Sequence, residues 1–370
     1  MVRNRMVAHM LRARTHTYTP AHMRQPTIRA CLGHPDAQIA RAKDGTVEVW
    51  DLFCCAGGFT TGATCAGCTV VYACDAWPEA LETYRRNHPH TRTQCLELPA
   101  TIPFPTDGRP FHVHGSPPCQ RFTDNGKRHN TKINLAHASN LIEWFLETVL
   151  TCGATSWSME QVSRSETRAI VEAVRKRHPG RVAYATVDFY DLGVPQRRKR
   201  LIAGSPALVS HLVRQACAAR RRSVRDVIPN PRGTMVRNSI NWTTKRLRAH
   251  RKAGQTKHVY TKATADDWLQ PLTGPAPTIA CNGDVRWWWR EPNGRSKCAK
   301  MSVLDTALLQ TFPRDYKWPA DVQLARKLIG NAVPPVVAER MLGGCEQPRR
   351  RPNPTLPIRC SRDDSDLEED

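Results

Sequence analysis

The sequence predicts an α/β fold with a Rossmann-like doubly wound sheet, because its first half has the pattern of a nucleotide-binding βαβ unit. An apolar run at residues 47–53 leads into the turn Gly57-Gly58, and a second apolar run at residues 69–74 ends at Asp75. In such units the glycines let the backbone approach a ligand, and an acid about 20 residues further on binds a ribose hydroxyl. We therefore expect a nucleotide-like ligand at this turn.

A proline-rich loop follows the next strand-like run, which covers residues 111–114. Its sequence is Gly115-Ser116-Pro117-Pro118-Cys119-Gln120. Open α/β sheets carry their chemistry at the carboxyl ends of strands, and the two prolines fix the backbone just before the thiol of Cys119. Most free cysteines are inert packing residues, but this position makes Cys119 the first candidate for a nucleophile.

Three later blocks continue the alternation of apolar and polar segments. The run at residues 156–159 ends at Glu160-Gln161-Val162, and the basic segment 194–200 enters the apolar residues 201–203. Near the end, Gly330-Asn331-Ala332-Val333-Pro334 opens a helix-like segment. An acid or a basic run alone usually marks a solvated surface, so the order of the blocks along the chain carries the argument.

From about Glu48 to Met341, these blocks resemble the cytosine-C5 DNA methyltransferase family. The matching peptides are Asp51-Leu52-Phe53 with Gly57-Gly58, Asp75 with Ala80, Tyr84 and Asn87, Pro118-Cys119-Gln120, Glu160-Gln161-Val162, Gln196 with Arg198 and Arg200, Pro277-Thr278-Ile279, Leu308 to Pro313, and Gly330 to Pro334. One block matches easily by chance, whereas a full ordered series does not. The resemblance implies a methyltransferase sheet with a small inserted target-recognition domain.

The resemblance also implies a chemistry and a set of residues. Cys119 adds to C6 of a flipped cytosine, Glu160 holds the base edge, and Arg198 helps to hold the base and the catalytic loop. S-adenosylmethionine is the implied methyl donor and double-stranded DNA the implied partner. The implied cofactor contacts are Phe53, Gly57, Gly58, Asp75, Asn331 and Val333, and the implied nucleic-acid contacts in these blocks are Gln120 and Arg200.

Three departures from the family pattern leave other functions open. Cys55 occupies a usual glycine position, Gln161 replaces an asparagine, and no Gly-Asp-Ile block is present within residues 93–98. One alternative is an RNA (tRNA) cytosine-C5 methyltransferase, although the Cys-Phe-Thr signature of that branch is missing between Ser205 and Gln270. The other alternative is a catalytically decayed DNA-binding homologue.

The charge of the chain indicates a polyanionic partner. The formal net charge is +22, and residues 211–270 hold fourteen lysines and arginines against three aspartates. This segment lies where the family carries its target-recognition region. Neutralisation of phosphates by such side chains is independent of sequence and sensitive to salt. The candidate phosphate contacts are Arg220, Arg221, Arg222, Lys245 and Arg246.

Composition shifts divide the chain into five expected parts. These are a basic N-terminal extension (1–45), a catalytic domain (46–205), a target-recognition region (206–275), a return to the catalytic domain (276–343) and a disordered tail (344–370). The tail is assigned because it combines an arginine run, scattered prolines and six terminal acids.

Cysteine usage and hydropathy narrow the class of protein further. Fourteen cysteines without a disulfide framework favour an intracellular, reducing compartment. Cys65-x-x-Cys68 is half of a zinc pattern without its second half, so we expect no metal. His112 and His114 share one face of a strand and are expected to be structural. No apolar run approaches the ~18 residues of a membrane span, and we expect a monomer with no membrane partner.

Overall fold

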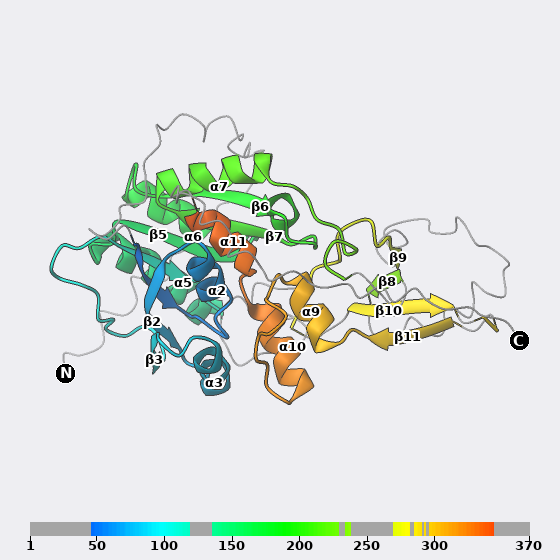
Figure 1. Ribbon diagram of the computed structural model, residues 1–370. Helices are drawn as coiled ribbons and strands as arrows, with labels where there is room; N and C mark the ends of the chain where they lie inside the picture. The colour runs from blue at the N-terminus through cyan, green and yellow to red at the C-terminus, as the bar shows by residue number, and fades with distance from the viewer. Residues whose placement is uncertain are drawn as a thin grey trace, which may run out of the picture. The chain divides into compact units, whose positions relative to one another are not determined.

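The computed structural model describes residues 46–118, 135–228, 234–237, 269–281, 285–290, 292–293 and 296–343 (Figure 1). Its main element is a seven-stranded sheet with the order β3-β2-β1-β4-β5-β7-β6. The strands are β1 (Glu48–Leu52), β2 (Thr69–Asp75), β3 (Arg92–Cys95), β4 (Phe111–Gly115), β5 (Ser156–Val162), β6 (Ala183–Asp188) and β7 (Lys199–Gly204). The expected N-terminal extension and C-terminal tail lie outside the described residues.

Pairing in this sheet is parallel from β3 to β5, whereas β7 runs antiparallel to both β5 and β6. The carboxyl ends of β1, β2, β4 and β5 therefore meet at one edge. This is the edge at which the sequence predicted the reactive residues. The predicted Rossmann-like doubly wound sheet is confirmed, with β7 as its one reversed strand.

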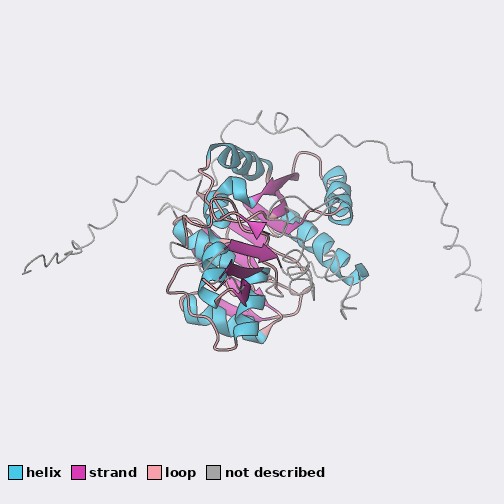
Figure 2. Cartoon of the chain, turned by 90° about the vertical axis from the view of Figure 1, so that its right-hand side faces the viewer, coloured by secondary structure: helices cyan, strands magenta, loops and turns pink. Residues whose placement is uncertain are grey.

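Helices cover both faces of the sheet (Figure 2). One face packs against α2 (Gly58–Cys65), α7 (Pro206–Ala218) and α11 (Pro335–Leu342), and the other against α5 (Leu135–Thr151) and α6 (Ser165–Arg177). Alternation along β1 divides its side chains between the two cores, with Val49 on the first face and Trp50 and Leu52 on the second. The remaining helices are α3 (Pro78–Asn87), the 3-10 helix η1 (Phe189–Leu192), α9 (Val303–Leu309) and α10 (Val322–Asn331).

Two glycines of α2 allow this helix to pack closely against the backbone at residues 333–335, near the start of α11. A Cβ atom on Gly58 would meet the carbonyl oxygen of Val333, and one on Gly62 would meet that of Pro335. Only glycine permits this backbone approach. The junction of α10 and α11 is thereby held directly beside the turn that follows β1.

A second sheet of four strands has the order β11-β10-β8-β9. Its strands are β8 (Thr234–Arg237), β9 (Leu269–Gln270), β10 (Val285–Arg290) and β11 (Ser296–Lys300). They come from both sides of the expected boundary at residue 275. Trp287 of β10 is buried and donates its Nε1–H to Asp305 of α9 at 3.1 Å, which explains one residue of the unusual triple tryptophan. None of the described helices has the length and apolarity needed to cross a membrane.

Candidate active site

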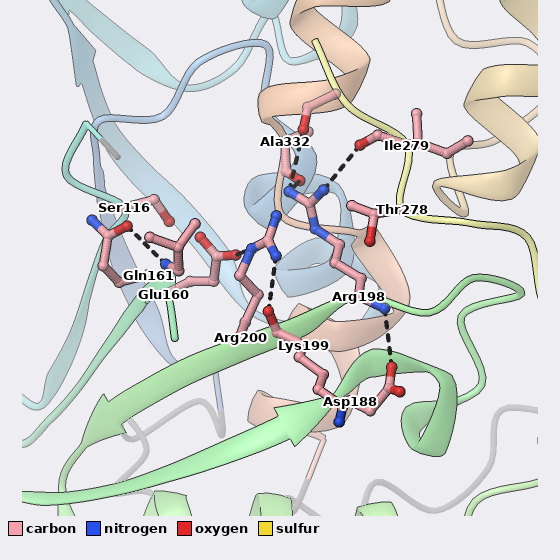
Figure 3. A network of polar contacts seen from close by, with 12 residues as sticks. Ser116, Glu160, Gln161, Asp188, Arg198, Lys199, Arg200, Thr278, Ile279 and Ala332 are labelled. Atoms are coloured by element: carbon pink, nitrogen blue, oxygen red, sulfur yellow. Dashed lines mark hydrogen bonds and ion pairs between the residues drawn. The ribbon is translucent and has the colours of Figure 1, made fainter. Parts of the chain in front are cut away.

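The loop that leads to Cys119 leaves β4 at the carboxyl edge of the sheet. Cys119 and Gln120 themselves lie outside the described residues. Gln161 donates its side-chain N–H to the carbonyl oxygen of Pro117 at 3.0 Å. Its side-chain oxygen accepts from the amide of Val162 at 2.8 Å (Figure 3). The longer side chain that replaces asparagine therefore braces the start of the cysteine loop.

Glu160 precedes this brace on β5 and is mostly buried. The antiparallel pairing of β5 with β7 brings Arg200 beside it, with the Nε of Arg200 2.9 Å from the Oε1 of Glu160 (Figure 3). Arg200 also donates to the carbonyl oxygen of Lys199 at 2.8 Å. A mostly buried ion pair thus joins β5 and β7, and β5 is the direct neighbour of β4, from which the cysteine loop leaves.

Arg198 is buried, and its guanidinium group is committed to backbone carbonyls (Figure 3). Its NH1 donates to Ile279 at 3.1 Å, and its NH2 donates to Gly330 at 3.2 Å and to Ala332 at 3.3 Å. The side chain therefore ties together three segments distant in sequence. Arg200, not Arg198, is therefore the arginine that contacts Glu160.

The turn after β1 has an unusual backbone. Phe53, Cys55 and Gly57 have φ values of 58°, 47° and 86°, all in the left-handed region. Two of the three therefore adopt a conformation that suits glycine and strains other residues. The carboxylate of Asp75 braces the turn, because it accepts from the amides of Cys55 at 2.8 Å and Trp77 at 2.9 Å. Each of its oxygens retains a further lone pair.

Asp51, at the end of β1, is a residue to which sequence reasoning gave no role. Its Oδ2 accepts from the hydroxyl of Thr60 at 2.7 Å, whereas its Oδ1 is buried without a hydrogen-bond partner in the described part of the chain. Burial, assisted by the negative charge of Asp75, raises the pKa of Asp51 to about 7. Its sequence signals were its place near the end of an apolar strand and its membership of the Asp51-Leu52-Phe53 block.

The two remaining candidate cofactor residues lie at the α10–α11 junction. Val333 is buried, and its carbonyl oxygen faces Gly58. Asn331 is the last residue of α10 and is exposed. The turn after β1 and this junction are therefore neighbours, as a shared ligand site requires.

The arginine triplet after α7 divides into different environments. Arg221 pairs with Asp191 at 2.8 Å and lies over the ring of Tyr190. Arg220 is 87% exposed and 3.8 Å from Asp226, and Arg222 is half-buried. Lys245 and Arg246 lie outside the described residues.

The sheet order and the chemistry gathered at its carboxyl edge are those of a Rossmann-like methyltransferase. Residues 47–347 match the sequence profile described as C-5 cytosine-specific DNA methylase, and the chain belongs to this family. It is accordingly a DNA cytosine-5 methyltransferase, of a family that depends on S-adenosylmethionine. The family match implies a DNA substrate.

Relatives with assigned activity agree with this membership. The chain is 26% identical over 294 residues to the type II methyltransferase M.HgiDI of Herpetosiphon aurantiacus, covering 77% of this chain and 89% of that protein. It is 26% identical over 322 residues to the type II methyltransferase M1.HphI of Haemophilus parahaemolyticus, covering 78% and 84%. The fold is similar to that of S. pombe Dnmt2 methyltransferase, with a TM-score of 0.54 and 14% identity over 80% of this chain and 97% of that one.

Proposed function

We propose that the protein methylates C5 of a flipped cytosine in double-stranded DNA through a covalent adduct with Cys119. The observation that carries the proposal is the Glu160–Arg200 ion pair beside the braced cysteine loop. Addition of the thiolate to C6 breaks the C5–C6 double bond and makes C5 nucleophilic. After the methyl group has joined C5, loss of the C5 proton restores the double bond and expels the thiolate.

Glu160 and Arg200 have distinct roles in this scheme. Glu160 contacts the N3 and amino edge of the cytosine, where charge changes as the thiolate adds. Arg200 holds the carboxylate of Glu160 in place from β7. Arg198 does not contact the base in this scheme. Its three hydrogen bonds to carbonyl oxygens hold the segments around the site in place. The cytosine must leave the duplex to reach this edge of the sheet, since C5 and C6 are covered within the stack.

The residues of the turn after β1 fit S-adenosylmethionine. The buried Oδ1 of Asp51 needs a donor, and the cofactor's ammonium group can supply one. The spare lone pairs of Asp75 suit ribose hydroxyls. Phe53 and Gly57 belong to the same turn, Gly58 follows it with Val333 against it, and Asn331 lies two residues before Val333. When bound, the cofactor supplies an electrophilic methyl group. The chain's own residues bind it, orient it and hold the target base.

Transfer of a labelled methyl group to duplex DNA tests the proposed pair. Arg200→Gln should lower kcat by about 10²-fold, the scale of one electrostatic contact in a transition state, with cofactor affinity unchanged. Arg175→Gln, which breaks a surface pair with Glu172, should retain wild-type turnover. Wild-type turnover in Arg200→Gln would remove Arg200 from the site.

A further inference from the structure

A chain of serine and histidine side chains runs between β4 and β5 toward the cysteine loop. Parallel pairing sets His112 opposite Ser156 and His114 opposite Ser158. The four hydrogen bonds join Ser156 Oγ to His112 Nδ1 at 2.8 Å, His112 Nε2 to Ser158 Oγ at 3.0 Å, Ser158 Oγ to His114 Nδ1 at 2.9 Å, and His114 Nε2 to Ser116 Oγ at 3.1 Å. This row of hydrogen-bonded side chains ends at Ser116, three residues before Cys119 in the sequence.

Both imidazole rings of this chain are neutral. Burial lowers the pKa of His112 to about 3, and burial and the neighbouring His112 lower the pKa of His114 well below its ordinary value. The ring of His114 also stacks on Phe59 of α2, with the ring centroids 3.5 Å apart. A neutral imidazole donates from one nitrogen and accepts at the other. Each histidine therefore donates one of its two hydrogen bonds and accepts the other, so both of its hydrogen bonds have the same donor-to-acceptor direction along the row.

The direction follows from a count of protons. Three hydroxyls and two neutral rings hold five protons for four hydrogen bonds, so one hydroxyl proton is left without a partner inside the chain. Ser156 and Ser158 are buried, whereas Ser116 is half-buried at the end of the chain. An unpaired buried donor is costly, and a donor at the open end is not. The favoured arrangement gives both rings an Nε2–H and leaves the proton of Ser116 free to donate.

Ser116 stands next to the cofactor turn, because its backbone amide donates to the carbonyl oxygen of Leu52, the last residue of β1, at 3.3 Å. We propose that the Ser116 hydroxyl donates a hydrogen bond to bound S-adenosylmethionine and that the buried serine–histidine chain holds it in this role. The inference rests on the cofactor site proposed above. His114 is then a positioning residue that acts through Ser116.

Calorimetric titration of the whole protein with S-adenosylmethionine tests this contact. Ser116→Ala should weaken cofactor binding about tenfold, a loss of about 1.4 kcal/mol. His114→Phe keeps a ring against Phe59 but removes both hydrogen bonds, and it should weaken binding similarly. Because the two residues act as one unit, the double variant should bind no more weakly than the weaker single variant. Ser163→Ala, which removes a hydroxyl pair with Thr186 outside the chain, should bind as wild type.

Nitrogen-15 NMR of labelled histidine tests the proton order independently of any binding. Signals assigned by their loss in His112→Phe and His114→Phe should show the Nε2–H tautomer for both residues in the wild-type protein. Nδ1–H tautomers, or wild-type affinity in Ser116→Ala, would overturn the inference. Both outcomes are distinct from failure of the proposed function, in which the wild-type protein itself would not bind the cofactor.

Discussion

The carboxylate of Asp51 is buried, and this has a measurable effect on stability. A carboxyl group whose pKa rises on folding stabilises the protein below its unfolded pKa, and this contribution is lost as the pH rises through its folded pKa. For Asp51 the window runs from pH 3.8 to about 7. Asp51→Asn should therefore raise the free energy of unfolding of the cofactor-free protein at pH 8, by up to about 4 kcal/mol.

Denaturant unfolding at pH 5 and pH 8 measures this effect. The advantage of Asp51→Asn should be larger at pH 8, and the same variant should bind S-adenosylmethionine more weakly, because the neutral amide attracts an ammonium group less. An Asp51→Asn variant that is no more stable at pH 8 than the wild type would contradict the burial argument.

Glu160 gives a second prediction for a single residue. Glu160→Gln should slow methyl transfer by about 10²-fold, because a single hydrogen-bonding and electrostatic contact to the base edge is lost. DNA affinity should change little, since phosphate contacts dominate binding. Single-turnover methylation and a DNA-binding titration separate these quantities, and an unchanged rate would show that Glu160 does not face the base.

The sequence identified Arg198 and Arg200 as site residues, but it could not show which of them contacts Glu160. Arg198 and Arg200 are two positions apart, so a strand pattern puts both on one side. Their different roles depend on carbonyl groups of Ile279, Gly330 and Ala332, which are far away in sequence. The burial and raised pKa of Asp51 could not be predicted from the sequence either, because they depend on the elements that pack around it.

The turn after β1 shows how one element deviates from the usual family pattern. Cys55 holds a left-handed conformation that costs a non-glycine residue about 1–2 kcal/mol. Cys55→Gly removes this strain, and the greater freedom of glycine in the unfolded chain offsets part of the gain. We expect the free energy of unfolding to rise by roughly 0.5–1 kcal/mol, and the cofactor to bind at least as tightly.

Cys55→Ala is the matched control for this prediction. It removes the thiol but keeps a Cβ in the left-handed region, so it should gain no stability. Equal stability of the glycine and alanine variants in chemical denaturation would show that the turn is not strained at this position.

At the same scale, the elements with strong hydrophobic patterns were predictable. The runs at residues 47–53, 69–74 and 111–114 all form strands of the central sheet. β3 was not predictable, because its four residues, Arg92–Cys95, are mostly exposed at the sheet edge and carry no apolar pattern. Its pairing sets Cys95 opposite Asp75, at the carboxyl ends of β3 and β2.

For the whole molecule, the arginine triplet gives a prediction about DNA binding. Arg220 is 87% exposed with only a distant contact to Asp226, and Arg222 is half-buried, whereas Arg221 is engaged by Asp191 and Tyr190. We expect Arg220 and Arg222 to contact phosphates. The double variant Arg220→Gln/Arg222→Gln should reduce the slope of log affinity against log salt by up to ~1.8, at ~0.9 per phosphate contact. Affinity for all DNA sequences should fall alike.

Arg221→Gln is the control and should leave the salt slope unchanged. DNA binding measured at several salt concentrations checks both variants. A wild-type slope in the double variant would show that these arginines form a solvated surface and not a DNA contact.

The organisation of the molecule was predictable only in outline. The basic segment 211–270 pointed to a separate region before residue 275, but β10 and β11 join the second sheet from beyond that point. Strand pairing between distant segments leaves no local signal in composition. The burial of Trp287 likewise depends on a distant segment, since its partner Asp305 belongs to a helix further along the chain.

The covalent adduct is the central claim, and duplex DNA with 5-fluorocytosine at the target position tests it most directly. Fluorine at C5 cannot leave as a proton does, so the protein should stay bonded to the DNA after methyl transfer. Incubation with S-adenosylmethionine should give a denaturation-resistant complex whose peptide map shows the base on Cys119, and Cys119→Ser should give none. A wild-type protein that methylates ordinary duplex DNA yet forms no such complex would contradict addition of Cys119 to C6.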